Sequence, residues 1–301
     1  MIGDANDPWR VLVCVALALF AAHLSNLHPD DDEEAIVRGY NHPGGDDPLA
    51  GHCTIPVEVD LPCDRFVREY MGLSPVVLRP STSHPLWANN QLFIDMSARD
   101  EMERDHGDLR VKMSTANSYT GRDWTDMAVR DYLRTHLHDA HSSQMGNETY
   151  YLFGSTHGPD WEAFLAQYHP PTQHYPSEAF FPSKPPSCDA DALAQATSTH
   201  TALSFGIAGR GSGVPFHFHG PGFLQQLHGR KRWFLYPPHA AVKFHPDEST
   251  LHWVESVYPT MAAPPTHECV LEPGDVIYFP SQWMHATLNL SPYTVFMATF
   301  A

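Results

Sequence analysis

The chain reads GSGVPFHFH from Gly211 to His219, and GDVIYFP follows from Gly274 to Pro280, with another histidine at position 285. Side chains on a strand alternate between its two faces, so His217 and His219 point to the same side. His285, from a later strand, can complete a triangle of imidazoles around a metal ion and leave positions open for substrate. The two segments therefore predict a small β-barrel with a three-histidine metal site.

A His-x-His pair is weak evidence when it stands alone. With 21 histidines in 301 residues, chance supplies roughly one or two such pairs, and His136-Leu137-His138 is another. The pair at 217 and 219 differs because glycine and proline break the chain on both sides and an apolar strand follows. The alternative is that His217, His219 and His285 are buried core histidines that make ordinary hydrogen bonds.

These motifs resemble the cupin superfamily and, more narrowly, its JmjC-domain proteins. In the cupin pattern a glycine stands six residues before His-x-His, as Gly211 does. The second motif has a glycine, a proline six residues on, and later a histidine and an asparagine, matched by Gly274, Pro280, His285 and Asn289. The resemblance implies a mainly β (α+β) fold, the double-stranded β-helix or jelly roll, with N-terminal helical and strand elaborations.

Further segments carry the resemblance towards one family of JmjC proteins. Gly229–Pro238 (GRKRWFLYPP) is similar to the strand that binds the co-substrate in JmjC proteins. The resemblance covers roughly Gly51 to the C-terminus. It also rests on Ser114–Asn117, Gly146–Tyr150, Ser204–Gly209, Val214–Phe223 and Trp283–Leu290.

The resemblance assigns the metal ligands residue by residue. His217 and His285 match both histidine positions of the JmjC metal site, whereas JmjC oxygenases carry Asp or Glu where this chain has His219. Three imidazoles leave the full 2+ charge on the metal and also suit Zn, Cu or Ni. Three-histidine iron sites occur among cupin dioxygenases, so the expected cofactor is Fe(II) or another divalent metal.

The resemblance also implies a 2-oxoglutarate site. Lys231 matches the basic residue that pairs with the distal carboxylate of 2-oxoglutarate, and a lysine inside a barrel is costly unless it meets an anion. The alternative is a solvated charge, although strand alternation places one residue of Arg230-Lys231-Arg232 inward. Asn289 can hydrogen-bond near the metal or satisfy backbone at a strand turn. Val214 stands where some relatives have a hydroxyl that contacts the co-substrate.

Composition limits the partners. The net charge is −17 and the pI is about 5.5, which argues against nucleic acid or an anionic membrane because both attract basic surfaces. The hydrophobic content of 42% is ample for a core, and barrels of this length often form one domain. We expect a protein substrate or protein partner, and the oligomeric state stays open.

The N-terminal part predicts secretory entry. Val11–Ala22 is an apolar run of signal-peptide length, too short for a comfortable membrane span. Two aspartates before it are atypical, so a signal anchor is the alternative. We expect residues 1–22 to be a signal peptide, residues 23–50 an acidic disordered linker, and residues 51–301 the JmjC/cupin domain with its core barrel at about 201–301. After cleavage the chain is not expected to be an integral membrane protein.

Cysteines and a glycosylation acceptor agree with that route. Removing Cys14 with the signal leaves an even number of cysteines, which predicts disulfides with three possible pairings. Four buried reduced thiols are the alternative. These cysteines are Cys53, Cys63, Cys188 and Cys269. Asn147 begins a usable glycosylation acceptor, and the expected location is the endoplasmic reticulum lumen or the outside of the cell.

Short patterns predict the other elements. We expect helices capped by Asp64 and Asp160, a helix that starts at Thr125, and a long loop over Gln173–Ser198. Short strands with turn residues between them follow from Thr201, which favours a barrel. Two functions remain open. One is a lumenal metal- and 2-oxoglutarate-dependent oxygenase that acts on a protein side chain, and the other is a catalytically inactive scaffold or binding protein in signalling or lumenal quality control.

Overall fold

The computed structural model of the chain describes residues 53–114, 124–137, 150–154, 156–180, 186–262 and 264–300. The expected signal peptide, the acidic linker and Asn147 lie outside these residues. The chain divides into the units Met1–Asp47 and Pro48–Ala301, and all the described residues belong to the second unit. Within the described residues, no helix combines the length and the apolar character that crossing a membrane requires.

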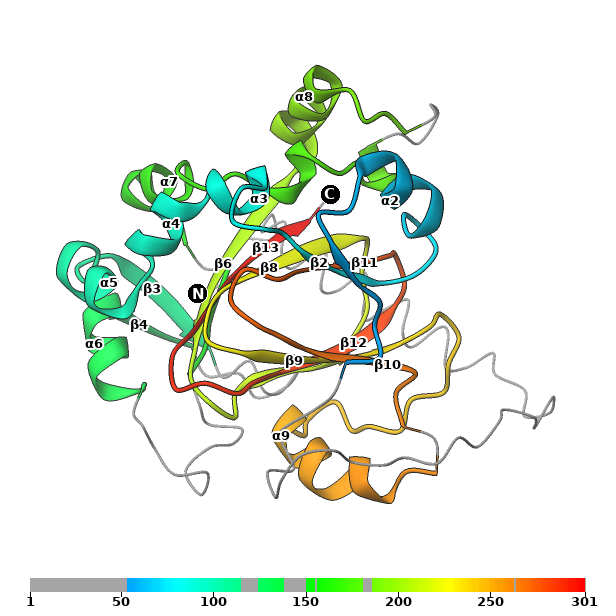
Figure 1. The fold of residues 1–301 in the computed structure, drawn as a ribbon. Coiled ribbons are helices and arrows are strands. Elements are labelled where there is room, and N and C mark those ends of the chain that lie inside the picture. Colours follow the sequence, from blue (N-terminus) through cyan, green and yellow to red (C-terminus); the bar gives the residue numbers. More distant parts are fainter. Residues whose placement is uncertain are drawn as a thin grey trace, which may run out of the picture. The chain divides into compact units, whose positions relative to one another are not determined.

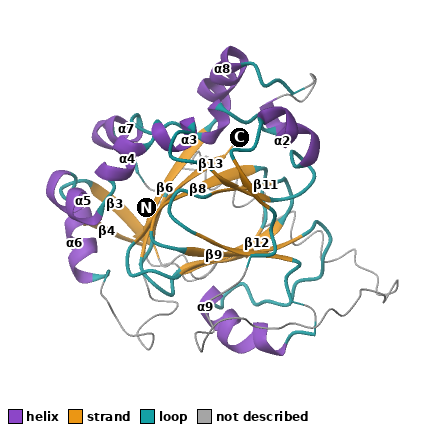
Figure 2. Ribbon diagram, viewed as in Figure 1, coloured by secondary structure: helices purple, strands orange, loops and turns teal. Residues whose placement is uncertain are grey.

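Two sheets face each other and form the barrel, which Figures 1 and 2 show from one end. Part of a seven-stranded sheet contributes, in neighbouring order, β11 (Val276–Phe279), β8 (Gly222–His228), β13 (Thr294–Phe300) and β6 (Ala202–Ala208). The opposite sheet has the order β10 (His267–Leu271), β9 (Lys231–Tyr236), β12 (Met284–Asn289) and β7 (Gly213–His217). Neighbouring strands in both sets are antiparallel, which confirms the predicted jelly roll.

Additional strands extend and flank this barrel. The seven-stranded sheet is lengthened at its two ends by β1 (Val57–Val59) with β2 (Val76–Arg79) and by β5 (Leu152–Phe153). A separate antiparallel pair consists of β3 (Arg110–Ser114) and β4 (Trp124–Ala128).

Helices cover the outer faces of both sheets (Figure 1). Those from the first part of the chain are α2 (Cys63–Glu69), α3 (Pro85–Ala88), α4 (Gln91–Met96), α5 (Arg99–Asp105), α6 (Val129–Thr135), α7 (Pro159–Leu165) and α8 (Ala190–His200). Short 3-10 turns lie at Pro171–Gln173 and Glu178–Phe180. On the other side, α9 (Thr250–His252) continues into a π-helix (Trp253–Val257) and a 3-10 turn (Tyr258–Thr260).

Apolar burial on both faces of each sheet holds the layers together, because apolar area removed from water is the main stabilising term. Inside the barrel, side chains from both sheets form one cluster that includes Trp233, Phe279 and Phe296. Outside the four-stranded sheet, alternate residues of β9 and β12 pack on Trp253 and its neighbours. Outside the larger sheet, one cluster involves α4 to α7 and another involves α2.

Three local expectations were wrong. Trp124–Ala128 pairs with β3 as a strand, and the helix that we expected from Thr125 begins at Val129. Asp64 and Asp160 lie inside the first turns of their helices, where the N-cap positions belong to Pro62 and Gly158. The segment expected to be a long loop contains most of α8, whose N-cap Asp189 accepts a hydrogen bond from the amide of Ala192.

The cysteines form two disulfides, one of the three pairings that the sequence left open. Cys53 is joined to Cys269 on β10, and Cys63 at the start of α2 is joined to Cys188 shortly before α8. The bridged residues are 216 and 125 positions apart in the chain. Links across such long segments restrict the unfolded chain, so they stabilise the fold.

A buried ion pair lies on the outer face of the four-stranded sheet. Arg232 Nη2 is 2.8 Å from Glu268 Oε2, and the hydroxyl of Tyr258 donates to the other carboxylate oxygen at 2.9 Å. Both charged side chains are fully buried. Because Arg232 points outward, the alternation of β9 turns its neighbour Lys231 into the barrel.

Candidate metal centre

Inward-facing residues of the four-stranded sheet are arranged in rungs, which are sets of cross-strand neighbours. The histidine rung is His267, Leu235, His285 and His217. The middle rung is Cys269, Trp233, Thr287 and Val214. The lysine rung is Leu271, Lys231 and Asn289. The residues between them on β9 and β12, such as Phe234 and Ala286, belong to the outer cluster, as strand alternation requires.

The structure brings the three predicted histidines together at one end of this sheet. His217 ends β7 and is the cross-strand partner of His285 on β12, while His219 follows β7. The ring centroid of His285 lies 4.3 Å from that of His217 and 4.9 Å from that of His219. One potential ligand atom from each histidine lies within 4.8 Å of the others.

Backbone carbonyls set the tautomer of all three rings. The Nδ1 atom of His217 lies 2.8 Å from the carbonyl of Pro215, that of His219 lies 2.7 Å from Gly220, and that of His285 lies 2.8 Å from Trp283. A carbonyl oxygen only accepts hydrogen bonds, so each Nδ1 carries the proton and donates. Each Nε2 then carries the lone pair that a metal needs, which is the usual outer-shell arrangement of metal-binding histidines.

Electrostatics favour the same neutral state. Burial lowers the pKa of His285 well below its ordinary value, and the neighbouring imidazoles of His217 and His219 lower it further. Burial also lowers the pKa of His219, although its hydrogen bond to the backbone opposes that shift. Three neutral nitrogen donors fit Fe(II) and other divalent first-row metals. His217 and His219 are half-buried, so the site borders the surface.

Aromatic rings hold the deepest histidine in place. Trp233 and Phe279 lie against the His285 ring at centroid distances of 5.5 and 4.8 Å, and the Trp233 ring is within 26° of parallel to it. Phe300 meets the His219 ring edge-on at 5.0 Å. This apolar shell leaves the imidazoles few orientations, so the three-histidine geometry is pre-organised.

Lys231 lies inside the barrel, four residues along the sheet register from His285. It is 1% exposed, and its nearest described contacts are the Phe296 ring, 3.4 Å from Nζ to the centroid, and the Tyr151 hydroxyl at 3.3 Å. Burial lowers the pKa of Lys231 well below its ordinary value. The buried carboxylates of the described residues, Glu268 and Asp275, are paired with arginines elsewhere. A buried lysine with this environment fits an anionic ligand.

Asn289, next to Lys231 on the lysine rung, makes the backbone contacts that were one of the two roles the sequence allowed. Its Nδ2 donates to the carbonyl and the hydroxyl of Ser212, and its own amide donates to the same carbonyl. These bonds fasten β12 to the turn before β7. Gly211, in that turn, has a φ of 83°, which favours glycine.

Tyr151 was not identified from the sequence. It directly precedes β5, a strand of the seven-stranded sheet, whereas Lys231 belongs to the four-stranded sheet. Its side chain is buried in the cluster inside the barrel. No spacing rule connects it to Lys231, since the two residues belong to different sheets and are 80 positions apart. The nearest segment that contributed to the family resemblance, Gly146–Tyr150, ends one residue before it.

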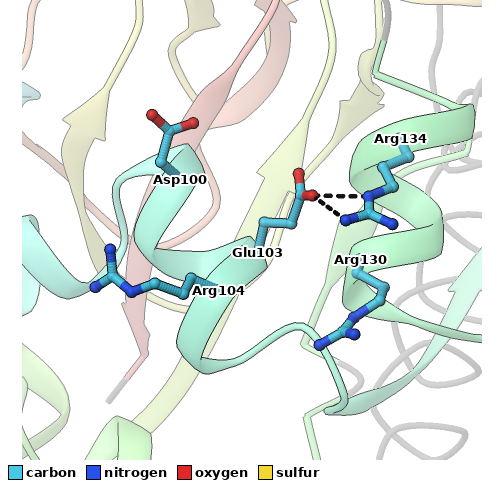
Figure 3. A pocket seen from close by; sticks show the side chains of 5 residues that line it. All are labelled: Asp100, Glu103, Arg104, Arg130 and Arg134. Atoms are coloured by element: carbon cyan, nitrogen blue, oxygen red, sulfur yellow. Dashed lines mark hydrogen bonds and ion pairs between the residues drawn. The ribbon is translucent and has the colours of Figure 1, made fainter.

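A hollow between two helices is unrelated to this site. It lies between α5 and α6, has a volume of about 420 Å³, and is lined by arginines and carboxylates (Figure 3). Each arginine already has an acidic partner: Arg134 contacts Glu103, and the others contact carboxylates near by. These surface ion pairs explain the arginines, so the hollow is not a candidate active site.

Comparison with known proteins identifies the family to which the motifs point. A JmjC domain model matches residues 184–299. JmjC domain-containing protein 8 from Homo sapiens is 38% identical over 296 residues, which is 97% of both chains, and the Rattus norvegicus protein is 37% identical over 250 residues, 82% of both. The solved structure of E. coli ycfD shares 16% identity at a TM-score of 0.40 over 81% of this chain and 54% of that chain, so the match spans about half of that protein.

Proposed function

The chain belongs to the JmjC-domain family of JmjC domain-containing protein 8, and on that premise we propose that it is a metal- and 2-oxoglutarate-dependent oxygenase with a three-histidine metal site. The observation that carries the proposal is the shared geometry of His217, His219 and His285, whose Nδ1 atoms all donate to the backbone. Bound Fe(II) supplies the one-electron and oxygen chemistry that side chains lack.

The residues of the chain then have separate roles. The three histidines hold the metal through Nε2. Lys231 binds the distal carboxylate of 2-oxoglutarate, and the hydroxyl of Tyr151, 3.3 Å from its amine, adds a second donor. The aromatic residues Trp233, Phe279 and Phe296 line the interior and keep water away from the reacting atoms.

We propose a protein side chain as the substrate. Two of the ligand histidines are half-buried, which leaves this end of the barrel accessible from the surface. The acidic net charge of −17 makes a nucleic-acid substrate unfavourable. Loops around a barrel mouth carry specificity, so the identity of the target depends on residues outside the metal centre.

Substitution of His219 by Asp tests the proposal at the position where this chain departs from the oxygenase pattern. Wild-type protein with Fe(II) and oxygen is expected to convert 2-oxoglutarate to succinate. His219→Asp keeps three ligands and lowers the net charge of the site by one, so preference should move from Zn(II) towards Fe(II) by about tenfold, or ~1.4 kcal/mol. Competition between the two metals, followed by elemental analysis, measures that change.

The same experiment separates the second candidate function, a binding protein without turnover. One observation favours it: the Phe296 ring packs directly on the Lys231 amine, where a carboxylate would bind. Absence of succinate from wild type and from His219→Asp, with normal folding and metal content in both, would establish the binding protein. Succinate from His219→Asp alone would indicate an enzyme that lost activity through this one ligand.

We also propose that the chain acts in the lumen of the secretory pathway or outside the cell. The apolar run Val11–Ala22, the two disulfides and the acceptor at Asn147 support this location. Protein recovered from secretory cells is expected to lack about its first twenty residues and to shift on a gel after glycosidase treatment. Asn147→Gln should remove the shift. A full-length, unglycosylated product in the cytosol would contradict the location.

A further inference from the structure

The middle rung lies between the two ends of the proposed co-substrate site. On β12, Thr287 stands between His285 and Asn289, and on β9 its cross-strand partner Trp233 stands next to Lys231 in the same inward series. A ligand that contacts both the metal and Lys231 must therefore pass over Thr287 and Trp233. What these two side chains offer decides which ligands fit.

Trp233 offers a hydrogen-bond donor. Its side chain is 3% exposed, and within the described residues its Nε1 has no hydrogen-bond partner. A buried N–H without an acceptor costs free energy, so native proteins almost always satisfy such groups. The ring itself is held by stacking on Phe279 and His285, at interplanar angles of 28° and 26°. Its N–H is thus a fixed donor inside the barrel.

Thr287 offers a second donor on the adjacent strand. Its Oγ accepts a hydrogen bond from the amide of Val214 at 3.3 Å, and it is 4% exposed. A hydroxyl both donates and accepts, so this bond uses the oxygen and leaves the hydrogen to donate. Within the described residues, that hydrogen has no acceptor. Val214 itself offers no side-chain hydrogen bond on this rung.

Together with Lys231 and Tyr151, these groups give the interior four donor groups, against one buried acceptor without a partner on the lysine rung, Asn289 Oδ1. A carboxylate has two oxygens with about four lone-pair sites, so it can satisfy several donors at once, whereas the oxygens at the metal end share their lone pairs with the metal. We propose that Trp233 and Thr287 select a dicarboxylate by donating to the same distal carboxylate that Lys231 binds. This inference rests on the proposed function.

Calorimetric binding of two ligands to the Mn(II)-loaded protein tests it without turnover. 2-Oxoglutarate has the distal carboxylate, and 2-oxopentanoate has a methyl group in its place. Trp233→Phe and Thr287→Val are each expected to lower the affinity for 2-oxoglutarate by about ten- to a hundred-fold, which is the range for loss of a hydrogen bond to a charged group. Both should weaken the affinity for 2-oxoglutarate far more than the affinity for 2-oxopentanoate, and Thr287→Val, which does not touch the histidine rings, should also leave the metal content unchanged. Thr287→Ser, which keeps the hydroxyl, should bind 2-oxoglutarate like wild type.

A matched control is Trp253→Phe, because the Trp253 Nε1 donates to the carbonyl of Lys243 outside the barrel. It should leave affinity for both ligands unchanged. If wild type binds 2-oxoglutarate and Thr287→Val and Trp233→Phe bind it equally well, or lose both ligands alike, the assignment of Thr287 and Trp233 is wrong while the proposed function stands. If wild type with metal binds no 2-oxoglutarate, the proposed function fails and this inference fails with it.

Discussion

Replacing His217 and His285 together with alanine is expected to abolish tight binding of divalent metal. Loss of one outer-shell partner of a ligand costs about 10–100-fold in metal affinity, and removal of two ligands costs more. Metal content after dialysis, measured by elemental analysis, should fall from near stoichiometric to background. The fold should still unfold cooperatively, because the barrel core on both faces of the sheets does not depend on the metal.

Controls separate loss of ligands from loss of structure. His285 is buried, so its removal leaves a cavity beside Trp233 and Phe279 and destabilises the barrel by itself. The variant with His217 and His219 both replaced avoids that cavity, since these residues are only half-buried, and it should lose metal equally. Replacing the exposed His200 and His252 with alanine should leave the metal content unchanged. Retention of stoichiometric metal by the His217/His219 variant would refute the site.

The clustering of the three candidate histidines could be predicted from sequence because its signal is local. The spacing of two residues predicted His217 and His219 on one strand face. The structure brings both to the site, although β7 ends at His217 and His219 lies in the segment after it. Gly274 marks the turn into the strand before His285. At Gly274 the φ is 97°, and a Cβ would collide with the Trp87 ring, which explains why the motif needs glycine. Each of these requirements involves only a few residues that are neighbours in the chain.

Partners set by long-range pairing could not be predicted in the same way. The rung that joins Trp233 to Thr287 depends on the register between β9 and β12, and a shift by one residue would turn each side chain to the opposite face. Likewise Trp124–Ala128 is a strand because β3 pairs with it, although the segment leads directly into a helical pattern. Tyr151 reaches Lys231 only because the two sheets close on each other.

Lys231→Met is expected to change stability in opposite directions with and without ligand. In the ligand-free protein, burial depresses the pKa of Lys231, so the unfolded chain holds a proton that the folded barrel binds poorly. Each pKa unit of that shift costs the folded state about 1.4 kcal/mol. Methionine fills a similar volume without this cost. The variant should therefore melt higher, by about 2–4 °C for each kcal/mol recovered.

The pH dependence of this gain has a definite sign. Below the depressed pKa, lysine is charged in both states and the full cost applies, so the advantage of Lys231→Met is greatest there. As pH rises towards the ordinary lysine value of 10.5, the unfolded chain also loses its proton and the advantage disappears. Melting curves across that window should show wild type approaching the variant. The exposed Lys243, replaced by methionine, should show neither the gain nor the trend.

With metal and millimolar 2-oxoglutarate the order should reverse. Wild type is expected to gain stability because the ligand binds only the folded state, by ~2.7 kcal/mol at a hundred times its Kd. Lys231→Met should gain almost no stability from the ligand, because the carboxylate of 2-oxoglutarate would be buried without its charged partner. That loss costs about 3–5 kcal/mol, or two to four orders of magnitude in affinity. A variant that keeps the full ligand-induced shift would show that Lys231 does not bind the carboxylate. A variant that melts lower than wild type without ligand would show that the lysine amine stabilises the barrel through its contacts with Tyr151 and Phe296.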